Sequence, residues 1–171
     1  MPQVGRTLTV VLGGARSGKS RYAEDLITRQ PRPWRYIATA EALDDEMRAR
    51  IACHRARRGE GWLTVEAPVA LPAALGAAGL LPVLVDCLTL WLSNLIRHGY
   101  DLQAATRALD MALDARLAPT VLVANEVGLG IVPDNALARA FRDAAGHLNQ
   151  RLAARADAVH FMVAGLPMQV K

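Results

Sequence analysis

Eight residues near the start of the chain, GGARSGKS at Gly13–Ser20, have the types and spacing of a phosphate-binding loop. Glycine carries no Cβ, so the backbone of such a loop can turn tightly and approach a phosphate closely. Its N–H groups then point inward and form a nest for an anion. In this pattern Lys19 reaches the β- and γ-phosphates of a nucleotide, and the Ser20 hydroxyl ligates Mg²⁺. The loop therefore predicts a site for a nucleoside triphosphate.

The residues on either side of this loop agree with that interpretation. Residues 8–12 (LTVVL) are apolar and mostly β-branched, as in a buried parallel strand. Residues 19–28 place apolar side chains on one face of a helix. A chance glycine–serine turn is the alternative, but the order of strand, loop and helix favours the phosphate loop.

Polar side chains follow two further predicted strands. Residues 83–86 (VLVD) predict an apolar strand ending at Asp86, from which a carboxylate can reach Mg²⁺ across from Ser20. Asn125 and Glu126 follow a predicted strand over residues 120–124 and are candidates for the substrate side, because open parallel sheets bind ligands at this edge. The alternatives are a turn or cap role for Asp86 and simple loop capping for the other pair; the phosphate loop upstream favours the metal role of Asp86.

A predicted helix over residues 43–58 carries His54 on a narrow stripe of side chains. The apolar members of the stripe are Leu43, Met47 and Ile51. Arg50, Arg57 and Arg58 lie within four residues of His54 and share its side of the helix. In one interpretation the arginines hold a polyphosphate on which His54 acts, and their charge favours the neutral, nucleophilic imidazole. In the other, His54 ends an apolar stripe beside a solvated basic face.

The predicted elements that position these residues alternate between strand and helix. The strands cover residues 8–12, 34–38, 62–66, 83–86, 120–124 and 158–163, and the helices cover residues 19–28, 43–58, 71–78, 88–96, 102–117 and 135–154. This alternation predicts an α/β fold with three layers around a mainly parallel sheet of about six strands. At 171 residues, the chain is expected to form a single domain over 1–171.

Composition narrows the class of protein. The chain is 52% apolar and 21% charged, which is typical of a globular protein, and its net charge of +4 suits an anionic ligand. Basic residues interleaved with aromatics are missing, so we expect no nucleic-acid partner. Residues 67–85 lack charge, but three prolines and two glycines argue against a membrane span. Cys53 and Cys87 form no spacing motif, and with no signal peptide at the N-terminus we expect free thiols in the cytoplasm.

Several separated motifs together resemble one family, the bifunctional adenosylcobinamide kinase / adenosylcobinamide-phosphate guanylyltransferases of cobalamin biosynthesis. The resembling segments are GGARSGKSRYAE at 13–24, YIATAEALDDEMRARI at 36–51, His54, Trp62, TVE at 64–66, NEVGLGIVPDNALARAFRDAAGHLNQRLA at 125–153 and GLPMQVK at 165–171. The resemblance covers nearly the whole chain from Leu8, which makes it far more specific than a lone phosphate loop.

The resemblance implies a P-loop NTPase fold similar to RecA and a transferase with two activities. Such an enzyme phosphorylates adenosylcobinamide with ATP or GTP. It then transfers GMP from GTP to adenosylcobinamide phosphate through a guanylyl-histidine, giving adenosyl-GDP-cobinamide and pyrophosphate. The characterised members are homotrimers.

The family's site residues carry over to matching positions here, with His54 as the guanylylated residue, Lys19 as a second catalytic residue, and Ser20 and Asp86 as ligands of Mg²⁺. The nucleotide contacts implied by the resemblance are Gly13, Gly14, Ala15, Arg16, Ser17, Gly18, Lys19, Ser20, Ala38, Thr39, Ala40, Arg55, Ala56, Arg57, Arg58, Glu66 and Asp86.

Two alternative functions remain open from the residues. A small-molecule kinase without nucleotidyl transfer fits the phosphate loop and leaves His54 structural. A GTP-binding switch fits less well, because Asn125-Glu126-Val127-Gly128 lacks the lysine and aspartate with which switches usually read guanine.

Overall fold

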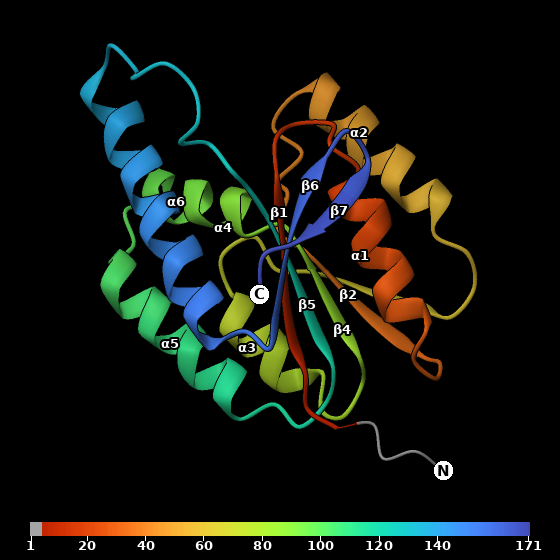
Figure 1. The fold of residues 1–171 in the computed structure, drawn as a ribbon. Helices are drawn as coiled ribbons and strands as arrows, with labels where there is room; N and C mark the ends of the chain where they lie inside the picture. The colour runs from red at the N-terminus through yellow and green to blue at the C-terminus, as the bar shows by residue number, and fades with distance from the viewer. Residues whose placement is uncertain (1–4) are drawn as a thin grey trace.

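A seven-stranded sheet runs through the middle of the protein (Figure 1). The structure is a computed structural model that describes residues 5–171, except for the side chains of Arg50 and Arg57. In space the strands follow the order β3-β2-β4-β5-β1-β6-β7, and all neighbours are parallel except β6 and β7. The strands are β1 Leu8–Gly13, β2 Trp34–Ala38, β3 Trp62–Glu66, β4 Val83–Asp86, β5 Thr120–Asn125, β6 Ala158–Val163 and β7 Leu166–Gln169.

Six helices complete the described part of the chain. They are α1 Lys19–Thr28, α2 Asp45–Arg57, α3 Leu71–Ala77, α4 Leu88–Arg97, α5 Leu102–Asp114 and α6 Ala136–Arg155. In Figure 1, α1 lies on one side of the sheet and α3 to α6 lie on the other, while α2 lies beyond one end of the strands. None of the helices in residues 5–171 is long and apolar enough to cross a membrane.

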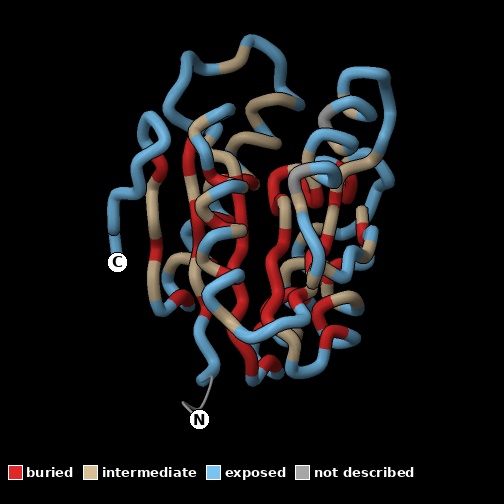
Figure 2. Tube along the Cα trace, turned by 90° about the vertical axis from the view of Figure 1, so that its right-hand side faces the viewer, coloured by how far each residue is buried: buried red, intermediate tan, exposed pale blue. Residues whose placement is uncertain are grey.

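Successive residues of a strand pack alternately into two separate cores, one on each face of the sheet. Val10 packs with the side chains of α3 to α6, whereas its neighbour Val11 packs with those of α1. This is the alternation that a strand covered on both faces requires. Figure 2 shows the same arrangement as buried strands flanked by helices with exposed outer surfaces. The expected three-layer fold is confirmed.

The C-terminal tail forms a seventh strand that was not expected. β7 pairs antiparallel with β6 through a turn at Ala164 and Gly165, both of which have positive φ angles. All four of its residues are exposed, and one of them is Pro167, so no apolar alternation marks the strand.

The helix that carries His54 starts later than the expected residue 43. Asp44 precedes its first turn, and its Oδ1 accepts a hydrogen bond of 2.7 Å from the Met47 amide, which makes Asp44 the N-cap. Leu43 therefore lies outside the helix and is 65% exposed. The expected apolar stripe is shortened to Met47, Ile51 and His54, all of which are partly buried.

Arg116 is a buried charged residue with a structural role. Its Nε donates to Thr120 Oγ1 at 2.7 Å, and its Nη atoms donate to the carbonyls of Leu75, Gly79 and Leu81 at 3.1, 3.2 and 2.6 Å. The guanidinium thus satisfies the carbonyls that end α3, although burial lowers the pKa of this arginine.

We expect Arg116→Ala to lower the free energy of unfolding by about 3 kcal/mol, because one buried and two partly buried carbonyls lose their donor and a cavity is left. Urea denaturation measures the change. Arg107→Ala, on an exposed position of α5, is the matched control and should stay within about 0.5 kcal/mol of the parent chain. Equal effects of the two substitutions would contradict the structural role.

Candidate functional site

The predicted phosphate loop joins β1 to α1 and is tightly packed. Lys19 Nζ donates to the Gly14 carbonyl at 2.5 Å and lies 3.4 Å from Ser17 Oγ. A Cβ at Gly13 would lie 2.7 Å from that same Oγ, so only glycine fits there. Gly165, in the turn before β7, donates its N–H to the Ser17 carbonyl at 3.2 Å. The C-terminal hairpin therefore supports the loop from outside.

Asp86, at the end of β4, is the point where the candidate side chains meet. Its Oδ2 accepts a hydrogen bond of 2.8 Å from the Tyr36 hydroxyl and lies 3.6 Å from His54 Nδ1. The Ser20 hydroxyl is close enough to this carboxyl group to lower its pKa. Burial alone would raise the pKa of Asp86, but its interactions with His54, Tyr36 and Ser20 outweigh burial and hold that pKa below its usual value. Asp86 is therefore a carboxylate that links the phosphate loop to the helix of His54.

A cavity of about 660 Å³ opens beside Asp86. Met47, Ile51 and His54 line it from α2, and the ends of β2 and β4 form its floor. The other lining residues that the sequence predicted are Ala38, Ala40, Arg55, Arg58, Glu66 and Asp86. Residues between Tyr36 and Leu90 in the sequence thus share one cavity of the size that small-molecule sites have.

Among the described residues, a carboxylate lies close to His54, which the sequence did not predict. The His54 imidazole lies 3.6 Å from Asp86 Oδ2, and Arg55, the next residue of α2, forms an ion pair with Glu66. Arg58 lies over the Tyr36 ring, with its guanidinium carbon 3.6 Å from the ring centroid. The side chains of Arg50 and Arg57, the other two arginines predicted near His54, are outside the described part of the structure.

One nitrogen of Arg58 is suited to binding an anion. Among the described residues, Arg58 Nη1 is buried and has no hydrogen-bond partner. A buried guanidinium N–H without a partner is costly, and a phosphate oxygen is a partner that suits it. Arg58 is thus prepared to bind a negatively charged group in the cavity.

None of the phosphate-loop residues Gly13–Ser20 belongs to the cavity lining, and four other predicted site residues, Thr39, Ala56, Asn125 and Glu126, also lie away from it. Thr39 is buried beneath it, where its Oγ1 donates to the Cys87 carbonyl at 2.6 Å and accepts from the Cys87 amide at 2.9 Å. Ala56 is exposed on α2. The Glu126 amide donates to the Gly13 carbonyl at 3.0 Å, which puts Asn125 and Glu126 beside the phosphate loop. Their substrate role stays a prediction.

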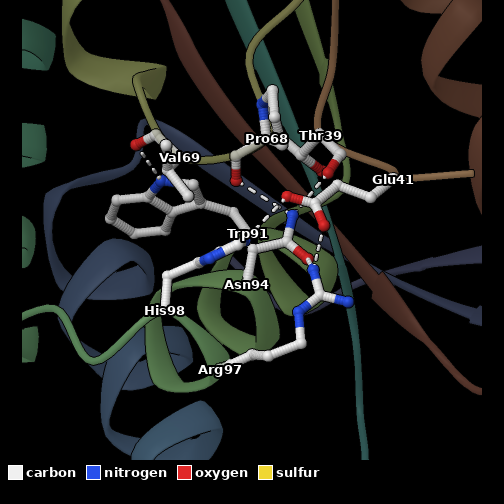
Figure 3. Close-up of polar contacts among 8 residues, drawn as sticks. All are labelled: Thr39, Glu41, Pro68, Val69, Trp91, Asn94, Arg97 and His98. Atoms are coloured by element: carbon white, nitrogen blue, oxygen red, sulfur yellow. Dashed lines mark hydrogen bonds and ion pairs between the residues drawn. The ribbon is translucent and has the colours of Figure 1, made fainter. Parts of the chain in front are cut away.

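Sequence reasoning missed a polar network at the edge of the cavity (Figure 3). Glu41, in the segment between β2 and α2, forms an ion pair with Arg97 and lies 3.1 Å from His98 Nε2. The buried Asn94 donates from Nδ2 to the carbonyls of Thr39 and Pro68 at 2.7 and 2.9 Å. The end of α4 thereby fixes the segment that leads into α2.

We expect Asn94→Ala to lower the free energy of unfolding by about 2 kcal/mol, because one buried and one partly buried carbonyl lose their donor. Thermal and urea unfolding measure this change. Ser93→Ala, at the exposed neighbouring position of α4, is the control and should change the free energy by less than about 0.5 kcal/mol. A loss no larger than that of the control would show that the network does not support the fold.

Comparison with known proteins shows the family to which the chain belongs. A family model described as "Cobinamide kinase / cobinamide phosphate guanyltransferase" matches residues 9–170. The chain is 49% identical over 167 residues to the bifunctional adenosylcobalamin biosynthesis protein CobP of Pseudomonas aeruginosa, covering 95% of this chain and 96% of that protein. It is 43% identical over 182 residues to the bifunctional adenosylcobalamin biosynthesis protein CobU of Salmonella typhimurium, covering 96% and 99%.

Solved structures with little sequence similarity share the fold. An ATPase from a bacterial type III secretion system superimposes with a TM-score of 0.57 at 10% identity, over 96% of this chain and 57% of that chain. The flagellar accessory protein FlaH of Methanocaldococcus jannaschii superimposes with a TM-score of 0.52 at 10% identity, over 98% and 79%. These similarities confirm the expected P-loop NTPase architecture of the RecA-like kind.

Proposed function

Because the chain belongs to the cobinamide kinase / cobinamide phosphate guanyltransferase family, and is therefore a bifunctional enzyme of cobalamin biosynthesis, we propose that one site centred on Asp86 performs both reactions. The observation that carries this proposal is the pair of contacts that Asp86 makes, with Ser20 of the phosphate loop and with His54 of α2. A kinase without nucleotidyl transfer has no use for the second contact. Family membership also argues against the GTP-binding switch.

In the proposed first reaction, the hydroxyl of the aminopropanol arm of adenosylcobinamide attacks the γ-phosphorus of ATP or GTP. A new O–P bond forms, the bond to the β-phosphate oxygen breaks, and the hydroxyl proton passes to water. The amides of Gly13–Ser20 and the Lys19 ammonium neutralise the charge on the phosphates. The role of the protein in this step is positioning and charge stabilisation.

In the proposed second reaction, His54 attacks the α-phosphorus of GTP, and pyrophosphate leaves as the P–N bond forms. A phosphate oxygen of adenosylcobinamide phosphate then attacks the same phosphorus, the P–N bond breaks, and adenosyl-GDP-cobinamide is released. Because Nδ1 faces Asp86, Nε2 is the nitrogen left to attack. Arg58, whose Nη1 needs a partner, stabilises the departing pyrophosphate. Covalent catalysis divides one difficult displacement into two easier ones.

Ser20 and Asp86 suit Mg²⁺, since a hydroxyl and a carboxylate are hard oxygen donors and the two lie within hydrogen-bonding reach. Residues 5–171 hold no cluster of three or more His, Cys, Asp or Glu side chains, so nucleotide oxygens and water would complete the shell. When bound, the ion neutralises charge on the phosphates.

Labelling with GTP that carries isotope on the α-phosphate tests this proposal. With Mg²⁺ and no corrinoid, we expect the protein itself to become labelled through a bond that is labile to acid and stable to base, as a P–N bond is. The labelled peptide should contain His54, with the phosphorus on Nε2. GTP labelled on the γ-phosphate is the control and should leave the protein unlabelled. An unlabelled protein that still phosphorylates cobinamide would leave the kinase alternative.

We further propose that this single domain assembles as a homotrimer and works in the cytoplasm, with neither nucleic acid nor a membrane as a partner. Exposed apolar side chains, including Leu129, Ile131, Leu166 and Met168, support an assembly that covers them. The free thiols of Cys53 and Cys87 support a reducing compartment. Light scattering coupled to gel filtration tests the trimer, and a monomeric mass would refute it.

A further inference from the structure

Tyr36, on β2, contacts two of the groups that the proposed second reaction needs. Its side chain is buried, with 3% of the residue exposed, and its hydroxyl donates to Asp86 Oδ2 at 2.8 Å. Its ring lies under the Arg58 guanidinium at 3.6 Å, and its edge packs against Trp62, with ring centroids 5.9 Å apart. The sequence pattern gave this tyrosine no role beyond the core of a strand.

The hydroxyl of Tyr36 determines where Asp86 can point. The same oxygen, Oδ2, receives the Tyr36 hydroxyl and faces His54 Nδ1, so the position of Asp86 fixes the partner of the imidazole. A carboxylate can only accept in this contact, so the Tyr36 hydroxyl is the donor that holds Oδ2 in place. Without that donor, the carboxylate could rotate away from His54.

The ring of Tyr36 determines where Arg58 can lie. Arg58 is the residue at which α2 ends, and its backbone has left the helical conformation. A flat aromatic face attracts a guanidinium and restricts its long side chain to one plane. In that plane, Nη1 is buried and unpaired beside the cavity.

We infer that Tyr36 is a positioning residue for guanylyl transfer. Its hydroxyl orients the Asp86–His54 pair for attack on the α-phosphorus, and its ring holds Arg58 for the phosphates that leave. This inference rests on the proposed function, because it assigns Tyr36 a role in the step that His54 performs. It predicts separate effects for the two parts of the side chain.

Single-turnover labelling by GTP carrying isotope on the α-phosphate separates the two parts. Tyr36→Phe keeps the ring, so the labelling rate at saturating GTP should fall about tenfold or more, while the dissociation constant for GTP stays within about threefold. Tyr36→Leu also removes the ring, and should weaken GTP binding by a further factor of about five. Arg58→Lys, which keeps the charge and loses the stacking, should weaken GTP binding similarly.

Tyr22→Phe is the matched control. That residue lies on α1, and its hydroxyl is 3.5 Å from His160 Nδ1, outside the cavity. Its labelling rate and GTP affinity should stay within about twofold of the parent chain. In an Asp86→Ala background, Tyr36→Phe should slow labelling by less than about twofold, because the hydroxyl acts through Asp86. A purely structural tyrosine would show no such coupling.

Two results would overturn the inference while leaving the proposed function intact: a Tyr36→Phe protein that labels His54 at the rate of the parent chain, or full-sized effects of Tyr36→Phe that persist without Asp86. Failure of the parent chain to become labelled is a different outcome, since it removes the guanylyl-histidine itself.

Discussion

We expect His54→Ala to abolish GMP transfer, with a loss of at least about 10³-fold, while phosphorylation of adenosylcobinamide stays within about threefold of the parent rate. Alanine offers no nitrogen to attack the α-phosphorus, so the P–N bond cannot form. The kinase reaction uses the phosphate loop, and His54 is not among the groups placed there. Two assays on one protein preparation measure the split: phosphate transfer from γ-labelled ATP to cobinamide, and pyrophosphate release from GTP.

His147→Ala is the matched control for this prediction, since His147 lies on an exposed position of α6. Both activities should stay within about twofold of the parent chain. The prediction is contradicted if His54→Ala still transfers GMP at an appreciable rate. Loss of both activities together would instead give His54 a role in building the site.

Most of the fold was predictable because short stretches of sequence are enough to identify its strands and helices. Runs such as residues 83–85 and 121–124 are continuously apolar, which is typical of strands in a sheet covered on both faces. All six expected strands formed, with ends that moved by one residue at most. β7 carries no such pattern, because it lies at the edge of the sheet with its residues exposed, and its register depends on pairing with β6.

The candidate site was only partly predictable, because its contacts are not local. The phosphate loop is a motif within eight residues, and Asp86 follows from its place at a strand end. The approach of His54 to Asp86 depends on how α2 lies across the ends of β2 and β4, which no spacing within α2 reveals. Of the three arginines expected around His54, Arg58 is the one whose side chain the structure describes, and its stacking on Tyr36 was not predictable from the helix either.

Polar partners far apart in the chain were missed for the same reason. Glu41 meets Arg97 and His98 only because β2 and β4 are neighbours in the sheet, which brings the end of α4 beside the segment after β2. Tyr36 looked like a core residue because it stands in a buried strand. The only signal that could have identified it was its hydroxyl, which lies two residues before the end of β2 and therefore near the edge of the sheet where ligands bind.

We expect Asp86→Asn to impair both reactions, each by about 10²- to 10³-fold, in contrast to the selective effect of His54→Ala. The amide has nearly the shape of the carboxylate but no charge, so it loses its attraction for Mg²⁺ beside Ser20 and its charge-assisted contact with His54. The same two assays measure the losses. Urea unfolding verifies that the variant is folded.

Asp25→Asn, on an exposed position of α1, is the control for removing one carboxylate and should leave both activities within about twofold of the parent chain. The pattern of losses in Asp86→Asn then decides how the two reactions share the site. A loss confined to GMP transfer would mean that Asp86 serves His54 alone and that the kinase reaction recruits its metal ligand elsewhere. A loss confined to phosphorylation would reduce the Asp86–His54 contact to a structural one. Only a joint loss fits a single carboxylate that holds the phosphate loop and the nucleophilic helix at one nucleotide.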